Sequence, residues 1–449
     1  MLLRKNVYFI KESDFLFWQK DAETMPRGEI RALQLKKLQH TVRWCYDRVL
    51  YYHQIMDKAG VTPDQIRTLD DIRRLPFTTK ADLRDNYPFG LFAVPKKEIV
   101  EIHASSGTTG KPIVGGYTRR DLDTWSDCVA RLAVAAGANQ DDISQIAFGY
   151  GLFTGAFGLH YALEKIGSMV VPISSGNSEK QIMLMKDFGT TLLVATPSYA
   201  VYLSELAKDM GVAGDLKLRL GLFGSEVCTT EMRDQIEKNI GILVTDNYGL
   251  TELGGPGVSG ECQYRDGLHI NEDHFLAEII DPDTGETLPE GETGELVITP
   301  LSKEAFPIFR YRTKDIAKIT YEPCQCGRTF ARMNKVVGRT DDMLIIKGVN
   351  VFPSQIESVL IQSPHIGPHY QLILRKKNYM DQLEVKVELI DSSLLDQYGA
   401  LEKAANEIRA DLRTVLGLDC KVTLVEPRSI ERSTGKAKRI VDLRGQSNA

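Results

Sequence analysis

Apolar residues return at a helical spacing in three stretches of this chain. From Arg27 to Ala59 they recur at intervals of three to five residues among charged side chains, which is typical of an amphipathic helix packed on a core. The same pattern runs from Leu122 to Gly137 and from Leu401 to Leu416, and the sequence Thr78 to Leu83 is a typical helix start. We expect a helix at each of these places.

Short apolar runs, separated by helical segments, occupy the middle of the chain. Each is long enough for one buried strand, and they cover residues 145–148, 169–173, 192–196, 218–223 and 242–246. Buried strands that alternate with helices are typical of parallel sheets. We therefore expect parallel sheets covered by helices in this region.

The strand pattern changes near Gly267. Residues 277–281 and 295–299 alternate between apolar and polar positions and are joined through a turn at 281–285, which predicts antiparallel strands. An antiparallel subdomain is therefore expected to follow the parallel sheets.

A second change comes after Gly338. Strand patterns at 370–375, 383–390 and 421–425 surround the helix expected from Leu401 to Leu416, which predicts a small α+β domain. The fold class expected for the whole chain is α/β, with a large N-terminal domain of parallel sheets covered by helices, an antiparallel subdomain, and a small C-terminal α+β domain.

Composition narrows the classes of function. The chain has 449 residues and a net charge of −5, with acidic and basic residues interspersed, so neither a nucleic acid nor a membrane surface is expected as its main partner. Its N-terminus lacks the pattern of a signal peptide, and its apolar runs are too short to span a bilayer. Seven cysteines, mostly scattered, are typical of a reduced, cytoplasmic protein. We expect a cytoplasmic protein that acts on small molecules.

Hydroxyl groups, glycines and a lysine are concentrated in one stretch, Ser105-Ser106-Gly107-Thr108-Thr109-Gly110-Lys111-Pro112. It follows an apolar and polar run from Ile99 to Ala104, so a strand is expected to lead into a turn whose backbone N–H groups and hydroxyls can bind phosphate. The stretch is not a Walker A loop, because Ser105 and Pro112 stand where that motif needs Gly and Ser or Thr. Taken alone, a stretch of this composition is more often an ordinary solvated loop.

Four further stretches join this one. They are Tyr248-Gly249-Leu250-Thr251-Glu252, Tyr311-Arg312-Thr313-Lys314-Asp315, Gly338-Arg339-Thr340-Asp341-Asp342 and Ser433-Thr434-Gly435-Lys436-Ala437-Lys438-Arg439. In this order and at these separations, the five stretches resemble the adenylate-forming acyl-CoA synthetase superfamily, over a region from about Pro76 to Arg439. Gly149 to Gly155, Gly267 to Ile270, Cys324 to Arg328 and the compact length are most similar to the branch of phenylacetate-CoA ligases.

The resemblance implies a two-step reaction. A carboxylate first joins the α-phosphate of ATP with release of pyrophosphate, and the acyl group then passes from the adenylate to the thiol of coenzyme A, leaving AMP. For this branch the acid is phenylacetate and the product phenylacetyl-CoA. The alternatives are a ligase for another aryl acid such as benzoate, an adenylating module that loads a carrier protein, and a nucleotide-binding regulator without turnover.

The resemblance also assigns residues to the nucleotide. The β- and γ-phosphates would be held by the turn, Ser105, Ser106, Gly107, Thr108, Thr109, Gly110 and Lys111. Glu252 is similar to the magnesium ligand of the family, which suits a hard cation, and Thr251 to a donor toward the α-phosphate. Asp315 would accept hydrogen bonds from the ribose hydroxyls, and Arg339 would reach the same nucleotide. The segments that would surround the adenine and the acyl group are Gly224, Ser225 and Glu226 together with Asp246, Asn247, Tyr248 and Gly249. Outside the family, Tyr248 to Glu252 would be an ordinary turn with a capping Glu.

Asp341 matches the hinge of the family, and a plain linker carboxylate is the alternative. The domains implied are an N-terminal helical region at 1–75, an AMP-binding domain at 76–340, and a mobile C-terminal domain at 341–449. Rotation of the small domain would replace Lys436, which serves adenylation, with Lys347, which serves thioester formation.

Tyr150, Phe153 and Phe157 bring aromatic surface together among glycines, which suits a pocket for a flat, apolar acid. Aromatic residues near a strand end are also typical of a protein core. Both interpretations are open from the sequence.

Cys262, His269, Cys324 and Cys326 fall in the region expected to be antiparallel. A Cys₃His zinc site that staples separated loops is one interpretation, and free thiols with a surface histidine are the other. The partners expected are an aryl acid, ATP with Mg²⁺, and coenzyme A, and formation of a homodimer is left open.

Overall fold

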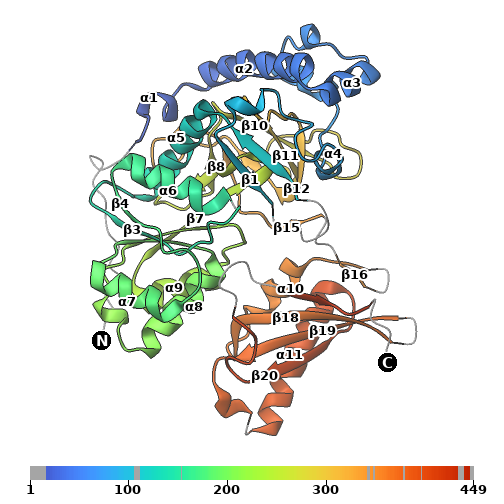
Figure 1. Ribbon diagram of the computed structural model, residues 1–449. Coiled ribbons are helices and arrows are strands. Elements are labelled where there is room, and N and C mark those ends of the chain that lie inside the picture. Colours follow the sequence, from blue (N-terminus) through green and yellow to red (C-terminus); the bar gives the residue numbers. More distant parts are fainter. Residues whose placement is uncertain are drawn as a thin grey trace.

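The protein is described here from a computed structural model, which describes residues 17–105, 112–152, 154–340, 344–346, 349–377, 380–395, 397–432 and 439–444. Figure 1 shows a large part built from residues 17–340 and a C-terminal part built from residues 344–444, coloured orange to red. Each has its own hydrophobic core, and the core of the C-terminal part contains residues only from Leu344 to Ile440.

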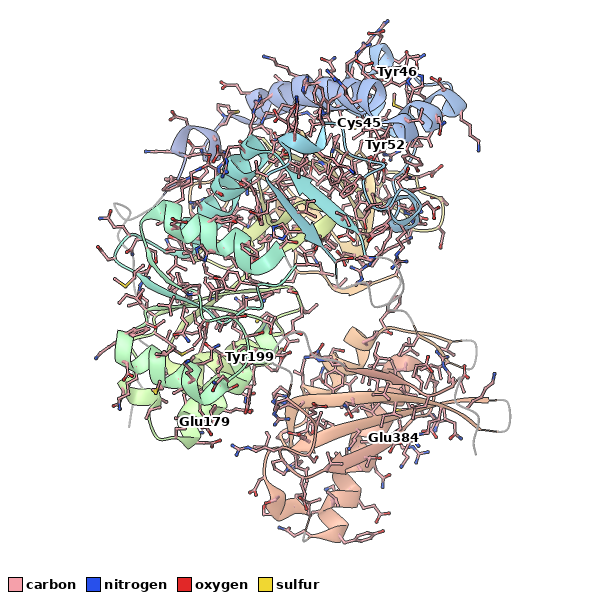
Figure 2. The ribbon with its side chains drawn as sticks, viewed as in Figure 1. Cys45, Tyr46, Tyr52, Glu179, Tyr199 and Glu384 are labelled. Carbon is pink, nitrogen blue, oxygen red and sulfur yellow. The ribbon has the colours of Figure 1, made fainter. Side chains whose placement is uncertain are left out.

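The chain begins with helices α1 (Lys20–Glu23), α2 (Arg27–Arg48) and α3 (Leu50–Ala59). The single helix expected from Arg27 to Ala59 is two helices, because Val49 has an extended backbone with φ −120° and ψ 109°. Cys45 and Tyr52, labelled in Figure 2, are fully buried beneath α2 and α3.

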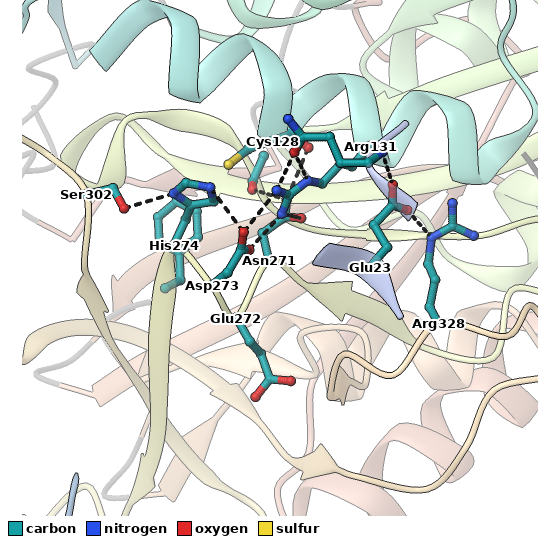
Figure 3. A network of polar contacts seen from close by, with 12 residues as sticks. Glu23, Cys128, Arg131, Asn271, Glu272, Asp273, His274, Ser302 and Arg328 are labelled. Atoms are coloured by element: carbon teal, nitrogen blue, oxygen red, sulfur yellow. Dashed lines mark hydrogen bonds and ion pairs between the residues drawn. The ribbon is translucent and has the colours of Figure 1, made fainter. Parts of the chain in front are cut away.

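A network of buried charges fixes the N-terminal helix α1 to the rest of the large part (Figure 3). The guanidinium of Arg131 donates to both carboxylate oxygens of Asp273 at 2.7 and 2.9 Å, and Arg328 donates to Glu23 of α1 at 2.7 Å. Burial works to raise the pKa of Asp273, but His274 and Arg131 hold it well below its ordinary value.

The largest sheet has nine strands in the order β13-β14-β9-β8-β7-β6-β5-β3-β4. In chain order they are β3 (Ile143–Ile146), β4 (Met169–Val171), β5 (Leu192–Ala195), β6 (Leu220–Gly224), β7 (Leu243–Leu250), β8 (Gly255–Glu261), β9 (Leu268–Ile270), β13 (Ile319–Thr320) and β14 (Arg332–Met333). Strands β3 to β7 pair in parallel, as the sequence predicted, and the pairs from β7 to β13 are antiparallel.

Helices cover both faces of the parallel half. They are α5 (Arg119–Ala136), α6 (Thr154–Ile166), α7 (Ser178–Phe188), α8 (Pro197–Asp209) and α9 (Thr230–Ile240). Alternate residues of β5 belong to different cores: Leu192 and Val194 pack with α5 and α6, whereas Leu193 and Ala195 pack with α7, α8 and α9. The α/β fold class expected from the sequence is thereby confirmed.

The change to antiparallel pairing comes at β8, earlier than the position near Gly267 that the sequence indicated. The sequence of β8, Gly-Pro-Gly-Val-Ser-Gly-Glu, lacks the alternation by which strands are recognised. Its glycines allow α5 to approach, since a Cβ on Gly257 would lie 2.9 Å from Val129 and one on Gly260 would lie 3.0 Å from Leu132.

Two smaller sheets complete the large part. A hairpin of β1 (Glu101–Ala104) and β2 (Val114–Tyr117) flanks the predicted phosphate turn, and α4 (Lys80–Asp85) precedes it. A four-stranded antiparallel sheet has the order β10-β11-β12-β15, with bounds Phe275–Ile280, Gly294–Pro300, Tyr311–Ala317 and Gly338–Arg339.

The C-terminal part is α+β, as expected. Its elements are β16 (Leu344–Ile346), β17 (Val349–Val351), α10 (Pro353–Leu360), β18 (Ile366–Lys377), β19 (Met380–Leu389), α11 (Tyr398–Leu416), β20 (Lys421–Val425) and β21 (Ile440–Asp442). Strands β20, β19, β18 and β21 form one sheet, against which α10 and α11 pack. None of the helices in the described ranges is long and apolar enough to cross a membrane.

Candidate nucleotide, acyl and metal sites

Strands β6 and β7 bring two of the predicted nucleotide segments together. Gly224 is the last residue of β6 and pairs with Asn247 of β7. A Cβ on Gly224 would lie 2.8 Å from Asn247 Oδ1, so only glycine allows this approach. Residues 246–249 lie within β7 rather than after a strand, because β7 continues past the end of β6 by pairing with β8.

Ser225 and Glu226 follow β6. Ser225 has a φ of 75°, and Glu226 Oε1 accepts a hydrogen bond of 2.7 Å from the backbone N–H of Ser198 in the first turn of α8. Glu226 thus serves the start of α8 in this structure, and its predicted part in nucleotide binding is untested.

Asp315, Tyr248 and Arg339 form a closed hydrogen-bonded group. The hydroxyl of Tyr248 donates to Asp315 Oδ2 at 2.6 Å, and Arg339 donates to Asp315 Oδ1 at 2.7 Å. Pairing of β12 with β15 places Asp315 directly opposite Arg339. Burial and the adjacent Asp315 raise the pKa of Tyr248 well above its ordinary value, so Tyr248 stays a neutral donor. Residues of two other strands, β7 and β15, therefore hold this carboxylate of β12 in place.

Thr251 and Glu252 follow β7 in a short 3₁₀ helix, Thr251–Leu253. Thr154, at the start of α6, donates to the hydroxyl of Thr251 at 3.0 Å. Glu252 is buried. The burial of Tyr311, together with the adjacent carboxylate of Glu252, raises the pKa of Tyr311 well above its ordinary value. Among the residues that the structure describes, no lysine or arginine forms an ion pair with Glu252. A buried carboxylate without such a partner fits a divalent cation.

The base of the predicted phosphate turn lies beside Thr251. Ser105 N–H donates to Ile113 O, and Ile113 N–H donates to Ser105 Oγ, both at 2.9 Å. A Cβ on Gly115 would lie 3.5 Å from Thr251 O. Strand β2 therefore passes close to Thr251, and Ser106, Gly107, Thr108, Thr109, Gly110 and Lys111 lie outside the described residues.

Two of the three aromatic residues proposed for the acyl pocket are in contact. The rings of Tyr150 and Phe157 meet edge to face with centroids 5.1 Å apart, and Tyr150 Oη lies 2.9 Å from Nδ1 of His160. His103, fully buried at the end of β1, packs on Phe157 with centroids 5.3 Å apart. Tyr150 and Phe157 also pack against the core that contains α5 and α6. Phe153 lies outside the described residues.

Cys262, His269, Cys324 and Cys326 come together as predicted. Their ligand atoms lie within 4.8 Å of one another, and all four residues are buried. Cys262 Sγ is 3.8 Å from Cys324 Sγ, too far for a disulfide, and Cys326 Sγ is 3.3 Å from His269 Nε2. The interpretation of His269 as a surface residue is therefore wrong, because β9 carries it into the interior.

Lys347, Lys436 and Asp341 also lie outside the described residues, so their roles stay predictions.

Two residues for which no role was predicted contact the proposed nucleotide residues. Thr154 contacts Thr251, and Tyr311 contacts Glu252. Thr154 directly follows the aromatic stretch, and Tyr311 opens one of the five motifs. Their contacts depend on strand pairing between distant segments, which no local pattern specifies.

Known proteins match nearly the whole chain. The profile of the AMP-binding enzyme family matches residues 93–300, and that of the AMP-binding enzyme C-terminal domain matches residues 348–444. The chain is 46% identical to phenylacetate-coenzyme A ligase of Thermus thermophilus over 444 residues, 96% of this chain and 100% of that protein. It is 47% identical to phenylacetate-coenzyme A ligase of Aromatoleum evansii over 426 residues, 94% of this chain and 96% of that protein.

Solved structures of 2-hydroxyisobutyryl-CoA ligase add information on the arrangement of the two parts. The postadenylation state with 2-HIB-AMP matches with a TM-score of 0.89 at 28% identity, covering 98% of this chain and 95% of that one. The thioesterification state with 2-HIB-AMP and CoA scores 0.70 at 29% identity, covering 99% and 96%. Because one protein gives both scores, the difference reflects how its parts are arranged, and the present chain is closer to the postadenylation arrangement. With both profiles matched and nearly half of all residues shared over the full length, the chain belongs to the phenylacetate-coenzyme A ligase family of AMP-binding enzymes.

Proposed function

We propose that this protein is an AMP-forming acid-CoA ligase whose acid is phenylacetate. In the first step a carboxylate oxygen of phenylacetate attacks the α-phosphorus of ATP, and the bond to pyrophosphate breaks. In the second step the thiol of coenzyme A attacks the acyl carbon of phenylacetyl-adenylate, loses its proton, and displaces AMP. The observation that carries the proposal is the preformed group of Tyr248, Asp315 and Arg339 beside Glu252, in a chain of this family.

In this proposal the large part binds the nucleotide through fixed groups. Both oxygens of Asp315 are fixed by hydrogen bonds, from Tyr248 and from Arg339, and an ionised carboxylate can accept several hydrogen bonds, including those from the ribose hydroxyls. Thr251 would donate toward the α-phosphate, and Ser105 to Lys111 would hold the outer phosphates. Gly224 to Glu226 and Asp246 to Gly249 would surround the adenine and the acyl group. Fixed donors of this kind stabilise a transition state without reorganisation.

Glu252 is proposed to hold Mg²⁺ together with phosphate oxygens. The fit rests on its burial without a described cationic partner. When bound, the ion would neutralise charge that develops on the phosphate oxygens. Tyr311, which stays protonated, would keep the carboxylate oriented.

The aromatic side chains of Tyr150, Phe153 and Phe157 are proposed to contact the ring of the acid. Tyr150 and Phe157 support this by their edge-to-face contact and partial burial, since such surfaces suit a flat apolar ring. Tyr150→Ala should raise KM for the aryl acid and leave KM for ATP nearly unchanged. Equal changes in both constants would indicate core damage instead.

We further propose domain borders at 75/76 and 340/341, with Asp341 as the hinge of a mobile C-terminal domain. Lys436 would serve adenylation and Lys347 thioester formation. The support is the whole-chain similarity to one ligase in two states, which favours the postadenylation arrangement.

A structural zinc ion is proposed for Cys262, His269, Cys324 and Cys326. Tetrahedral geometry with Zn–S bonds of about 2.3 Å places two sulfur ligands about 3.8 Å apart, and Cys262 Sγ and Cys324 Sγ are 3.8 Å apart. The ion would join the loop after β8 to the loop that carries Arg328, and through Arg328 to α1.

The test of the main proposal is pyrophosphate release across a panel of acids, with and without coenzyme A. Phenylacetate should give the highest kcat/KM and yield phenylacetyl-CoA. A preference for benzoate would show that the substrate is a different aryl acid. Transfer of the acyl group to a carrier protein but not to coenzyme A would show that the protein is a carrier-loading module and not a CoA ligase.

All seven cysteines are free and buried, which supports a compartment that keeps thiols reduced. We propose the cytoplasm as the site of the reaction. Light scattering of the purified protein would decide whether it forms the homodimer that the sequence leaves open.

A further inference from the structure

The C-terminal part meets the large part along helices α8 and α9, and both parts contribute charged side chains to the contact. A cavity of about 600 Å³ lies there, lined by residues of both parts that include Glu205, His369, Glu388 and Arg432. An exposed ion pair joins Arg428 to Asp209 at the end of α8. The two hydrophobic cores do not merge across this contact, so ion pairs between the parts can contribute to how they fit together.

Glu205 of α8 faces two basic side chains of the C-terminal part, those of His369 and Arg432. Its Oε1 lies 3.6 Å from His369 Nε2, and its Oε2 lies 4.0 Å from Arg432 Nη2. Gln235 of α9 donates to Oε1 at 2.8 Å and fixes the carboxylate from its own side. Burial works to raise the pKa of Glu205, but His369, Arg432 and Gln235 hold it below its ordinary value. Glu205 is therefore a carboxylate that stays charged, three-quarters buried at the contact.

Arg432 is itself rigidly held within the C-terminal part. It donates to both carboxylate oxygens of Glu388 at 2.8 Å, and the backbone N–H of Ile430 donates to Glu388 Oε1 at 2.7 Å. Glu388 is almost fully buried. In the sequence, Arg432 comes directly before the motif Ser433 to Arg439. Because Arg432 is fixed in this way, an interaction between Glu205 and Arg432 restrains the position of the whole C-terminal part and not only that of one side chain.

We propose that Glu205 is a positioning residue for the first half-reaction, in which its carboxylate attracts His369 and Arg432 and holds the C-terminal part in the orientation seen here. The inference rests on the proposed function, because it assigns this orientation, which is closer to the postadenylation than to the thioesterification arrangement of 2-hydroxyisobutyryl-CoA ligase, to the adenylation half of the cycle. Thioester formation then has a distinct requirement. The interactions of Glu205 with His369 and with Arg432 must both break before the C-terminal part can rotate. Glu205 acts only through these partners and does not touch the substrate.

The test compares Glu205→Gln with the matched control Glu179→Gln. Both changes remove one negative charge from a helix on the same face of the sheet, and Glu179 is exposed on α7, away from the C-terminal part (Figure 2). Adenylation is measured by phenylacetate-dependent exchange of pyrophosphate with ATP, and the second step by adding coenzyme A to preformed phenylacetyl-adenylate. Melting temperatures of all variants establish that they fold.

Glu205→Gln should slow adenylation by roughly tenfold, within the usual range of coupling between sites, while the second step stays the same or becomes faster. Glu205→Asp, which keeps the charge, should recover part of the adenylation rate, and Glu179→Gln should match the wild type in both steps. Equal rates for Glu205→Gln and the wild type, or equal losses in both steps, would overturn the inference. A wild type that exchanges no pyrophosphate with phenylacetate would instead refute the proposed function.

Discussion

The proposed nucleotide site and the contact of the C-terminal part are built in opposite ways. Asp315 is buried, and two neighbouring strands supply the groups that fix it, with hydrogen bonds of 2.6 and 2.7 Å. At the other contact, Glu205 lies 3.6 Å from His369 and 4.0 Å from Arg432 beside a cavity, and Arg428 of the nearby ion pair is 65% exposed. Exposed ion pairs contribute little stability.

The difference suits two distinct tasks: the proposed nucleotide site has to stay fixed, whereas the contact of the C-terminal part has to break and form again. A site that must stabilise one transition state gains from groups that are fixed before the substrate arrives. A contact that must open in each cycle gains from weak charge pairs, since these form and break without exposing a hydrophobic core. The following changes are chosen to break or sharpen this comparison, beginning with the largest expected effect.

Lys436→Ala should separate the two half-reactions most strongly. If Lys436 stabilises the transition state of adenylation, its loss should slow adenylate formation roughly 100- to 1000-fold, as is usual for such a contact. Preformed phenylacetyl-adenylate should still react with coenzyme A. Lys347→Ala should show the reverse pattern. Equal damage to both steps by either variant would contradict alternation of the C-terminal part.

Asp315→Asn should lower kcat/KM for ATP roughly 10- to 100-fold, because hydrogen bonds to a charged group contribute about 1.5–3 kcal/mol. The substitution also leaves Arg339 without its partner carboxylate. Asp283→Asn, in an exposed turn, is the control and should leave the constant unchanged. Isothermal titration with AMP provides an independent measure, and unaltered affinity in Asp315→Asn would remove Asp315 from the nucleotide site.

Cys324→Ser should abolish zinc binding and lower Tm by several degrees, as expected when a ligand of a structural metal site is lost. The purified wild type should contain close to one equivalent of zinc by elemental analysis. Cys420→Ser changes a buried cysteine of the C-terminal part, away from the cluster, and should keep the metal. A wild type without metal and with unchanged stability in Cys324→Ser would show that these are free thiols.

Asp246→Asn should have the smallest effect, visible only as a function of pH. Burial, reinforced by the charge of Glu261, raises the pKa of Asp246 to about 7, whereas in the unfolded chain the carboxyl titrates near about 3.9. Between about pH 4 and 7 the unfolded chain releases a proton that the folded chain keeps, so the free energy of unfolding falls as the pH rises. Asp246→Asn has no titrating carboxyl at this position, so its free energy of unfolding lacks this decrease with pH.

The Tm of Asp246→Asn relative to that of the wild type should therefore rise between about pH 4.5 and 7.5. Differential scanning calorimetry at several pH values measures it. A constant difference across this window would mean that Asp246 titrates at its ordinary pKa.

The sequence predicted elements better than it predicted the contacts between them. The strands β3 to β7 and the helices that cover them follow from periodicity, because one face or both faces of each element are buried. Strand β8 was missed because its glycines serve close packing of α5 rather than alternation. The break at Val49 was also missed, since a single residue with an extended backbone leaves the apolar spacing intact.

The candidate sites show the same limit. The Cys262, His269, Cys324 and Cys326 group was predicted because ligand chemistry restricts which residues can come together. The nucleotide residues were assigned by family resemblance, whereas Thr154 and Tyr311 came only from the fold. Glu205 could not be predicted at all, because the contact depends on how two separately folded parts are placed.

The central claim is that one C-terminal part serves the two half-reactions in two orientations. Asp209→Cys combined with Arg428→Cys places thiols on the two sides of the contact, where both native residues are exposed, and all seven native cysteines are buried. A bismaleimide with a reducible spacer would then lock the orientation seen here. The locked protein should form phenylacetyl-adenylate at the rate of the unlocked protein, yield no phenylacetyl-CoA, and regain thioester formation after reduction. Thioester formation by the locked protein at the unlocked rate would contradict the claim.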